Sequence, residues 1–437
     1  MNRVYIKKTQ EYIGQEVELV GFCQVIRDQG KIKFIILRDI SGIIQLVILP
    51  DFSQALEVAK SLSIESVISV KGLVKEEKQA PGGLEIQVKE IEILSKADPE
   101  LPIPIIEKGA EEADLQIRLD WRWLDLRKPE KALIFQVWTL MEQSFREYWT
   151  KNNYFEIHSP KFMSTPSESG AELFEVKYFD RKAYLAQSPQ FYKQMAMACG
   201  FERVFEVGPV FRANPSFTSR HDTEFTGYDM EISFIDSHQD VISEEQKAIQ
   251  YVLSKIKEVY GDQIKKAYNR EIVVPELPFP QVTMKEAKEI LAKLNVPSEK
   301  AGDLNPKEER QLSEHIKKEK NHEFVFVTEY PIDIRPFYHM RFEAQPNLTK
   351  SFDLLWNGLE ITTGAQREHR YDILVKQAKE KGLSLEPIQF YLNFFKYGCP
   401  PHGGLGLGPS RMLMKIFNIA NVREVTYLYR GVKRLTP

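Results

Sequence analysis

The first hundred residues alternate between apolar and polar positions in short runs, a pattern typical of β-strands that bury one face. These runs cover residues 16–21, 34–37, 43–49, 67–74 and 84–94. Between the third and fourth runs, residues 55–62 place apolar side chains at helical spacing instead. Five short strands with a helix after the third predict a small Greek-key β-barrel of the kind that binds oligonucleotides, over residues 1–97.

A proline-rich segment, DPELPIP at residues 98–104, interrupts this pattern and is typical of a stiff linker. We therefore expect a hinge over residues 98–128. After it the apolar spacing becomes that of a long amphipathic helix, which Pro129 can open. The apolar face of this helix contains Ala132, Phe135, Trp138, Met141 and Phe145.

Strand and helix patterns alternate from there to the end of the chain. A strand over residues 154–158 stops at Pro160, residues 283–322 are predicted to be a charged, helical insertion, and a strand resumes at residues 325–328. We therefore expect a second domain of mixed strands and helices over residues 129–437.

The composition, with 43% hydrophobic and 28% charged residues among 437, is that of an ordinary soluble protein with a large core. No apolar run is long enough to cross a bilayer, and residues 1–10 lack the apolar stretch of a signal peptide. Cys23, Cys199 and Cys399 are too few and too scattered for a disulfide framework or a zinc site. We therefore expect a cytoplasmic protein without a membrane partner.

The net charge of −3 neither predicts nor excludes a nucleic-acid partner, because a local basic face is what matters. Basic residues do gather within the predicted barrel. They are Lys7, Lys8, Arg27, Lys31, Lys33 and Arg38. Such a cluster is equally typical of a solvated strand edge and of a nucleic-acid surface, so charge alone leaves both interpretations open.

A glycine-rich run near the carboxyl end, GGLGLGPSR at residues 403–411, carries the first candidate chemistry. Alternate glycines remove the side chains from one side of an extended segment, so that a flat ring or a phosphate can lie against the backbone. Arg411 follows at the start of the next helical stretch, where its guanidinium can pair with phosphate oxygens. Taken alone, such a run is more typical of a hairpin or a helix lead-in than of a nucleotide site.

A second element lies at residues 211–225, where two strands flank a loop. Phe225 can stack on a base, and Arg212 can pair with a phosphate that gains charge in a transition state. Each of these residues taken singly is typical of an ordinary surface or core position. Their occurrence together with the glycine run and Arg411 favours an adenine-nucleotide site.

These elements resemble the motifs of class II aminoacyl-tRNA synthetases. The helix and strand that end at Pro160 are similar to the family's first motif, which forms a dimer interface; residues 211–225 are similar to the second, and residues 404–411 to the third. The barrel and linker favour the aspartyl, asparaginyl and lysyl subgroup. The runs SPQFYKQ at 188–194 and GAQREHR at 364–370 resemble the archaeal and eukaryotic type of aspartyl enzyme.

The resemblance implies an α+β chain: an oligonucleotide-binding barrel followed by a catalytic domain with an antiparallel sheet flanked by helices. It implies a homodimer that activates L-aspartate with ATP and Mg²⁺ and transfers it to tRNA. The implied ATP-binding residues are Arg212, Asn214, Arg220, His221, Asp222, Phe225, Glu360, Gly408, Pro409, Ser410 and Arg411, with Arg212, Arg411 and Glu360 as the catalytic set. The implied metal residues are Glu360, Asp353 and Thr363.

For the amino acid, the resemblance implies Glu168, Gln190, Lys193, Arg212, Asp229, Thr363 and Arg367. Glu168 would meet the ammonium group, while Lys193 and Arg367 would take the side-chain carboxylate. Aspartate and asparagine are nearly isosteric, so a pocket must separate them by charge, and Lys193 therefore favours aspartate.

The amino acid's own carboxylate is the nucleophile, so the reaction needs aligned anions and charge neutralisation rather than a general base.

The barrel is expected to unstack anticodon bases, with Phe34 as the stacking ring. The implied anticodon residues are Arg27, Phe34, Gln45, Gln24 and Pro81. Gln24 and Pro81 stand where enzymes that discriminate between tRNAs tend to have tryptophan and lysine, which suggests charging of both tRNA(Asp) and tRNA(Asn) and a downstream amidotransferase.

Asn214, in the predicted catalytic domain, replaces a glutamate usual in the family, and we expect activity to survive because asparagine retains a carbonyl oxygen.

Three other interpretations remain open at this point. An asparaginyl-tRNA synthetase would share the fold, but Lys193 argues against it. An amide-forming paralogue that adenylates aspartate would resemble only the catalytic domain, and the barrel weighs against it. A nucleic-acid-binding protein with an inactive synthetase domain would not need Arg212, Glu360, Arg367 and Arg411 together.

Overall fold

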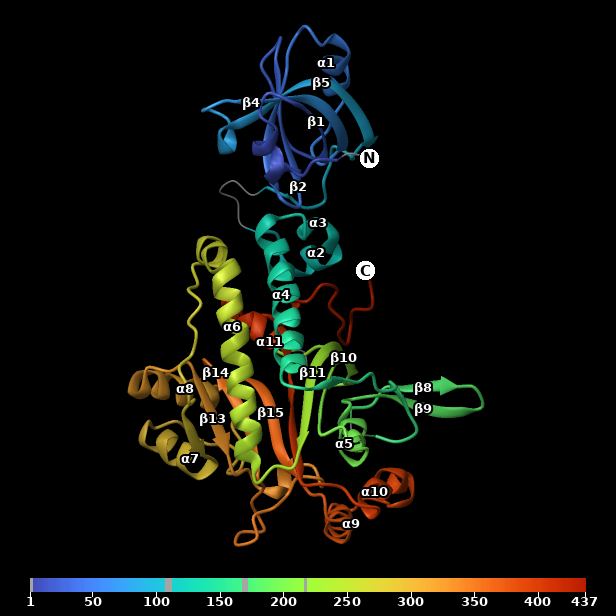
Figure 1. Cartoon of the computed structure of the whole chain (residues 1–437), viewed down its shortest axis with the longest axis vertical. Helices are drawn as coiled ribbons and strands as arrows, with labels where there is room; N and C mark the ends of the chain where they lie inside the picture. The colour runs from blue at the N-terminus through green and yellow to red at the C-terminus, as the bar shows by residue number, and fades with distance from the viewer. Residues whose placement is uncertain (1–2, 107–111, 167–171, 216–217) are drawn as a thin grey trace. The chain divides into compact units, whose positions relative to one another are not determined.

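The computed structural model describes residues 3–106, 112–166, 172–215 and 218–437 and divides the chain into two compact units (Figure 1). The first unit is Met1–Pro129 and the second is Glu130–Pro437. The whole of the segment predicted as a hinge, residues 98–128, therefore belongs to the first unit. In the described part of the chain, no helix combines the length and apolar character needed to cross a membrane.

The first unit contains a closed five-stranded barrel, which confirms the prediction from the alternating runs. Its strands are β1 (Glu16–Asp28), β2 (Lys33–Asp39), β3 (Gly42–Ile48), β4 (Val67–Glu76) and β5 (Leu84–Ser95), closed in the order β1-β2-β3-β5-β4. Helix α1 (Ser53–Lys60) lies between β3 and β4, as expected. Leu19, Ile35, Leu46 and Ile68 are fully buried in its core, because one side chain in two along each strand points inward.

Short helices precede, interrupt and follow the barrel strands within the first unit. They are η1 (Ile6–Tyr12) before β1, η2 (Pro81–Gly83) between β4 and β5, α2 (Leu115–Asp120) and α3 (Arg122–Asp125). Asp125 is completely buried and its Oδ2 accepts from Arg122 Nη1 at 2.7 Å. The end of the predicted linker is thus helical and held by buried ion pairs rather than extended.

The second unit is built on an eight-stranded sheet in the order β12-β13-β14-β15-β16-β11-β10-β6. The strands are β6 (Phe155–Glu156), β10 (Arg203–Phe211), β11 (Glu224–Ser233), β12 (Gln281–Thr283), β13 (Phe324–Thr328), β14 (Ser351–Trp356), β15 (Leu359–Arg367) and β16 (His402–Leu407). The six central strands are antiparallel, whereas β12 and β6 pair in parallel with their neighbours. The predicted antiparallel sheet is therefore mixed at its two edges.

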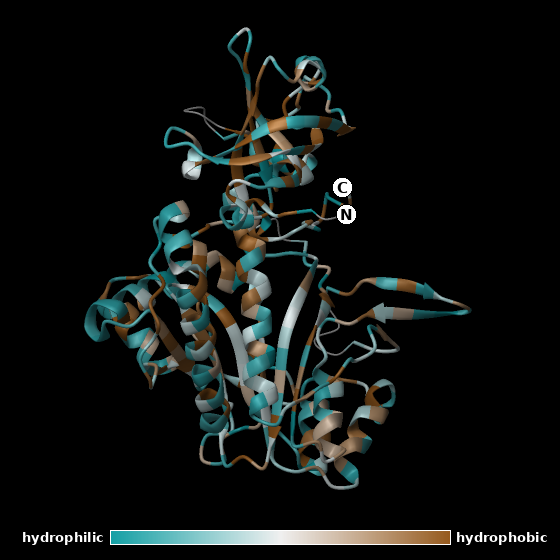
Figure 2. Ribbon diagram, turned by 45° about the horizontal axis from the view of Figure 1, so that its top comes forward, coloured by the Kyte–Doolittle hydropathy of each residue, from teal (hydrophilic) through white to brown (hydrophobic). Residues whose placement is uncertain are grey.

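Helices α4 (Pro129–Lys151) and α6 (His238–Tyr268) lie across one face of this sheet in both views (Figures 1 and 2). The ring of Phe145 lies 5.5 Å from that of Tyr228, and the ring of Trp149 lies 4.8 Å from that of Phe205. In Figure 2 hydrophobic and hydrophilic residues alternate along both helices, as expected for helices that bury one face against a sheet. This face is therefore closed by packing.

The remaining elements surround the sheet. They are β7 (Phe162–Met163), β8 (Glu175–Tyr178) and β9 (Arg181–Leu185) in a small sheet; α5 (Gln190–Ala198), α7 (Met284–Lys293), α8 (Pro306–Lys320), α9 (Tyr371–Glu380), α10 (Gln389–Lys396), α11 (Pro409–Phe417) and α12 (Val422–Val425); and the turns η3 (Ile332–Ile334) and η4 (Glu386–Ile388). Helices α7 and α8 occupy the segment expected to be charged and helical, and they pack against β13 through a common apolar core.

Candidate active site

Strand β11 turns Tyr228 toward α4, so its neighbours Gly227 and Asp229 point to the opposite face of the sheet. There they line a cavity of about 740 Å³. Most of the residues expected to bind nucleotide or amino acid meet on its wall: Gln190, Lys193, Arg212, Asn214, Arg220, His221, Asp222, Phe225, Asp229, Glu360, Thr363, Arg367, Gly408, Ser410 and Arg411. Residues more than two hundred positions apart thus share one cavity.

Two expected residues do not line the cavity, and a third lies outside the described residues. Asp353 is buried beside the cavity, and its Oδ2 accepts from Arg335 Nη2 at 2.7 Å. Pro409 is the buried first residue of α11 and does not line the cavity. Glu168 lies outside the described residues.

Residues 403–407 of the glycine run belong to β16, between β15 and β11 in the sheet, and residues 409–411 begin α11. Gly406 faces Asp229 and Thr363 in the strand register and lines the cavity, as does Gly408. At Gly404 a Cβ atom would lie 2.1 Å from Glu231 Oε2. The run therefore does leave bare backbone along the cavity, and one of its glycines also makes room for a buried carboxylate.

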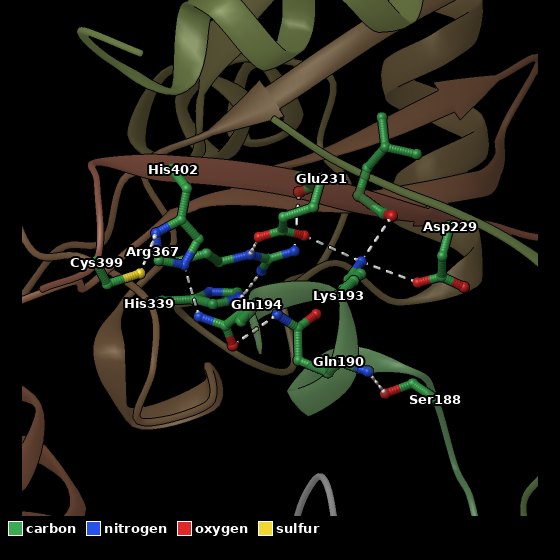
Figure 3. Close-up of polar contacts among 12 residues, drawn as sticks. Ser188, Gln190, Lys193, Gln194, Asp229, Glu231, His339, Arg367, Cys399 and His402 are labelled. Atoms are coloured by element: carbon green, nitrogen blue, oxygen red, sulfur yellow. Dashed lines mark hydrogen bonds and ion pairs between the residues drawn. The ribbon is translucent and has the colours of Figure 1, made fainter. Parts of the chain in front are cut away.

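Two cations and two carboxylates form a buried cluster at one end of the cavity (Figure 3). Lys193 Nζ donates to Asp229 Oδ1 and to the carbonyl oxygen of Leu405, both at 2.9 Å, and lies 3.3 Å from Glu231 Oε2. Arg367 Nε donates to Glu231 Oε1 at 3.0 Å. Glu231 thus connects the two cations that were expected to bind the amino-acid side chain.

Burial and charge pull the pKa values of the two carboxyls in opposite directions. Burial raises the pKa of Asp229, and Lys193 opposes this only in part. Burial also acts to raise the pKa of Glu231, but Arg367 and Lys193 outweigh it and hold the pKa below its usual value. Glu231 is therefore the firmly ionised partner of the cluster.

Neutral side chains surround this cluster. Gln190 Nε2 donates to Gln194 Oε1, and Gln194 Nε2 lies 2.9 Å from His402 Nε2. Burial lowers the pKa of His402 to about 4. Arg367 Nη1 donates to His339 Nε2 at 3.0 Å, and burial, followed by the charge of Arg367, holds the pKa of His339 well below its usual value. Both imidazoles are therefore neutral hydrogen-bonding groups.

The other end of the cavity is rich in arginine. Arg411 Nη1 donates to Glu360 Oε1 at 3.0 Å and to the Glu360 carbonyl oxygen at 2.8 Å. The guanidinium of Arg212 lies 5.8 Å from the centre of the Phe225 ring. Burial raises the pKa of the nearby Asp222 carboxyl to about 7. This end offers positive charge beside an aromatic face, which suits a nucleotide.

Sequence reasoning missed Glu231, His339 and Arg335, all of which contact a predicted residue. The spacing on β11 held a signal for the first of them: Asp229 and Glu231 are two positions apart, so a strand places both on one face. No comparable signal marks His339 or Arg335, because each meets its partner only through the folding of a loop onto the sheet.

The barrel presents a separate candidate surface. Phe34 is half-buried and lies outside the hydrophobic core, directly opposite Arg27 on β1. Gln45 on β3 is opposite Ile36 of β2, and Ile36 lies two residues from Phe34 on the same face of that strand. An outward Phe34 is the arrangement that a stacking platform requires.

Part of the predicted basic cluster is not on this surface. Lys33 is buried and paired with Asp28, and Arg38 is buried with both terminal nitrogens on the Glu65 carboxylate, at 2.9 and 2.8 Å. Neither cation therefore presents free charge on this surface: the buried Glu65 carboxylate neutralises Arg38, and Lys33 is covered although its partner Asp28 is largely exposed. Gln24 is half-buried at a bulge in β1, whereas Pro81 is exposed at the start of η2.

Comparisons with known proteins agree with this geometry. A family model described as tRNA synthetases class II (D, K and N) matches residues 114–430, and one described as an OB-fold nucleic acid binding domain matches residues 17–94. The chain is 42% identical over 438 residues to the aspartate--tRNA(Asp/Asn) ligase of Aeropyrum pernix, covering 99% of this chain and 98% of the relative. It is 41% identical over 432 residues to the aspartate--tRNA(Asp) ligase of Pyrococcus abyssi, covering 98% of each.

A solved structure is similar in fold over nearly the whole chain. Asparaginyl-tRNA synthetase from Pyrococcus horikoshii, complexed with asparaginyl-adenylate, superposes with a TM-score of 0.91 at 32% identity and 99% coverage of both chains. The two relatives named for aspartate are 42% and 41% identical to this chain, whereas the asparaginyl structure is 32% identical, so overall similarity favours aspartate. The two aspartate relatives differ in their tRNA names but hardly in identity, so overall similarity does not decide between the tRNAs.

Proposed function

This chain belongs to the class II tRNA synthetases of the D, K and N type, and we propose that it is a ligase that activates L-aspartate with ATP and transfers it to both tRNA(Asp) and tRNA(Asn). The family resemblance inferred from the sequence is thereby confirmed. The barrel is its anticodon-binding domain, and the relatives at 42% and 41% identity are both named aspartate--tRNA ligases.

The choice of aspartate rests on one observation, the buried pair of cations Lys193 and Arg367 joined by Glu231. A desolvated side-chain carboxylate needs cationic donors, whereas an amide facing Lys193 would leave buried donors poorly matched. Lys193 is only 2% exposed, so water does not weaken this selection. The cluster therefore favours aspartate over asparagine.

Adenylate formation follows from the positions of these charges. The α-carboxylate of the bound aspartate is itself the nucleophile, so the enzyme must bring two anions together and neutralise the charge that grows on the phosphate. Arg212 and Arg411 supply fixed positive charge at the nucleotide end of the cavity, and Phe225 offers its ring to the adenine. The acceptor hydroxyl of tRNA then takes the aspartyl group from the adenylate.

Magnesium fits at this end of the cavity. Glu360 and Thr363 line it, and the buried Asp353 Oδ1 has no hydrogen-bond partner. Within the described residues no three His, Cys, Asp or Glu side chains form a metal cluster, but Mg²⁺ usually takes one or two protein carboxylates and completes its shell with phosphate oxygens and water. Glu360 and Asp353, with Thr363, would hold the ion, which supplies positive charge to the phosphates.

The tRNA choice rests on two barrel positions. Gln24 and Pro81 lack the indole and the ammonium group expected of an enzyme that rejects tRNA(Asn). An exposed proline offers no side-chain donor to a base, so this site has less means to separate the two anticodons. Charging of both tRNAs would require an amidotransferase to convert the misacylated product to Asn-tRNA(Asn).

Two experiments test these proposals. Pyrophosphate exchange with ATP and either aspartate or asparagine, without tRNA, should proceed with aspartate; preference for asparagine would overturn the aspartate assignment. Aspartylation of purified tRNA(Asp) and tRNA(Asn) should give kcat/KM values within about tenfold of each other. Strong rejection of tRNA(Asn) would overturn dual specificity while leaving aspartate activation intact.

The remaining expectations concern assembly and location. The family's first motif corresponds to α4 and β6, where Phe155 is 60% exposed, and we propose that this segment joins two copies of the chain. Analytical ultracentrifugation should find a dimer that Phe155→Asp weakens; a wild-type monomer would exclude a dimer.

An enzyme that charges tRNA is expected in the cytoplasm, which fractionation of the source cells would test.

A further inference from the structure

Helix α8 has no part in the chemistry described so far, yet one of its side chains holds an arginine of the nucleotide site. We propose that Glu309 is a positioning residue for ATP: its carboxylate fixes Arg220 at the nucleotide end of the cavity before the triphosphate binds. Glu309 Oε2 accepts from Arg220 Nη1 at 2.6 Å, and the Gly358 carbonyl oxygen accepts from Nη2 at 3.3 Å. This inference rests on the proposed ATP-dependent function.

The position of α8 relative to the site is fixed by packing. Leu312 and Ile316 on α8 join Val325 and Leu355 of the sheet in one buried apolar core. Gly358, at the turn between β14 and β15, has a φ of 75°, and a Cβ there would lie 2.7 Å from Arg310 Cα. Only glycine permits so close an approach of this turn to the helix.

That contact connects α8 directly to the catalytic strand. Gly358 is two residues before Glu360, the partner of Arg411. Glu309 is next to Arg310 on the helix, so the close packing at Gly358 brings the Glu309 carboxylate to the nucleotide end of the cavity. The helix and the strand therefore form one rigid support for the arginines.

Arg220 itself lies between β10 and β11, outside any helix or strand. It lines the cavity with two nitrogens already hydrogen-bonded to the support described above. A long side chain held in one rotamer loses less conformational freedom when it binds an anion. Glu309 thus reduces the entropic cost of phosphate binding by Arg220.

The electrostatics agree with this arrangement. Glu309 is 7% exposed, and burial raises the pKa of its carboxyl while Arg220 opposes the rise. The charge of Glu360 also raises this pKa and that of Arg411 lowers it, so Glu309 lies within the same charged group as the catalytic pair. A buried carboxylate here is costly unless Arg220 stays beside it, which keeps the arginine in place.

Isosteric substitution tests the proposal. Glu309→Gln should raise KM for ATP in pyrophosphate exchange about five- to tenfold, leave KM for aspartate within twofold, and weaken ATP binding measured by calorimetry without aspartate. Glu314→Gln, on the exposed side of the same helix, is the matched control and should change neither constant. An unchanged KM for ATP in Glu309→Gln would overturn the proposal, because Glu309 would then have no effect on ATP binding. A lower KM would also overturn it, because Glu309 would then compete with the phosphates for Arg220.

A double-mutant cycle separates positioning from general support of the fold. If Glu309 acts through Arg220, adding Glu309→Gln to Arg220→Gln should produce no further rise in KM for ATP. Additive effects would show that Glu309 only stabilises the helix and would overturn the proposal. Failure of the proposed function itself is distinguishable, since the wild-type enzyme would then show no aspartate-dependent exchange at all.

Discussion

Arg367 donates from Nη1 to Nε2 of His339 at 3.0 Å, so a cation expected to bind the substrate's side chain is held by a neutral imidazole. His339 is 2% exposed, and its burial keeps the pKa well below the usual value. The ring therefore accepts a hydrogen bond without competing for the negative charge of the substrate. None of the sequence motifs and runs that predicted the site residues includes His339.

Replacing His339 should weaken aspartate binding specifically. In His339→Leu, Arg367 loses an acceptor and its guanidinium is less firmly oriented. KM for aspartate should therefore rise about tenfold, which corresponds to the free energy of one hydrogen bond to a charged group. KM for ATP should stay within twofold, because Arg367 lies in the amino-acid cluster. Pyrophosphate exchange measures both constants, and His339→Gln, which restores an acceptor oxygen, should recover part of the loss. Equal changes in both constants would contradict this role.

Lys193→Leu should reduce the preference for aspartate. The substitution leaves Asp229 and Glu231 with one fewer cation, so the pocket repels a second side-chain carboxylate. The ratio of kcat/KM values for aspartate and asparagine in pyrophosphate exchange should fall by about 100-fold or more, as expected when a buried charge loses its partner. Lys182→Leu, at an exposed lysine paired with Glu175, is the control. Unchanged selectivity in Lys193→Leu would argue against this pocket.

Arg212→Ala should lower adenylation strongly. Fixed positive charge at the reacting phosphate is worth several kcal/mol in comparable sites, so kcat/KM for exchange should drop about 100- to 1,000-fold. Arg181→Ala, at an arginine whose side chain is 77% exposed, should leave the rate unchanged. Normal exchange in Arg212→Ala would remove it from the catalytic set.

Phe34→Ala should separate the two half-reactions. Loss of one base–aromatic stack costs ~1–3 kcal/mol, so kcat/KM for tRNA aspartylation should fall by about 5- to 150-fold. Pyrophosphate exchange should stay at the wild-type rate, because the barrel holds no residue of the cavity. Ile64→Ala, at an exposed apolar position of the first unit, should affect neither reaction. A loss of exchange in Phe34→Ala would instead indicate a folding defect.

Glu245 on α6 should make the second unit less stable as the pH rises. Burial raises the pKa of Glu245 to about 8 from 4.5, although the Thr362 hydroxyl opposes the shift. The folded state therefore binds this proton more tightly than the unfolded state, and the associated stability is complete below pH 4.5 and lost as the pH approaches 8.

An uncharged substitute checks the sign of this effect. Glu245→Gln cannot ionise, so its melting temperature should exceed that of the wild type by roughly 2 °C or more at pH 8.5, and the difference should shrink at pH 5. Scanning calorimetry of both proteins across this range measures the difference directly. A difference that grows toward acid pH would show that Glu245 is charged and paired in the folded state.

Much of the fold was accessible from the sequence because its signals are local. Alternation along residues 16–94 predicted the barrel, and Pro129 with the apolar spacing after it marked the start of α4. The hinge over residues 98–128 stays a prediction, because its prolines carry a local signal, whereas the helices α2 and α3 and the buried ion pair at Asp125 within this segment depend on tertiary contacts.

The sequence by itself determined the secondary-structure pattern, the family motifs and the residue types that surround the cavity, since each is carried by neighbouring positions. Only the tertiary structure decided which charges pair. Sheet register places Glu231 between Lys193 and Arg367, and helix packing at Gly358 sets Glu309 against Arg220. The same physics buries Arg38 against Glu65 and pairs Lys33 with Asp28, because a cation's environment depends on which carboxylate folding brings within reach, and no periodicity in the chain encodes that distance.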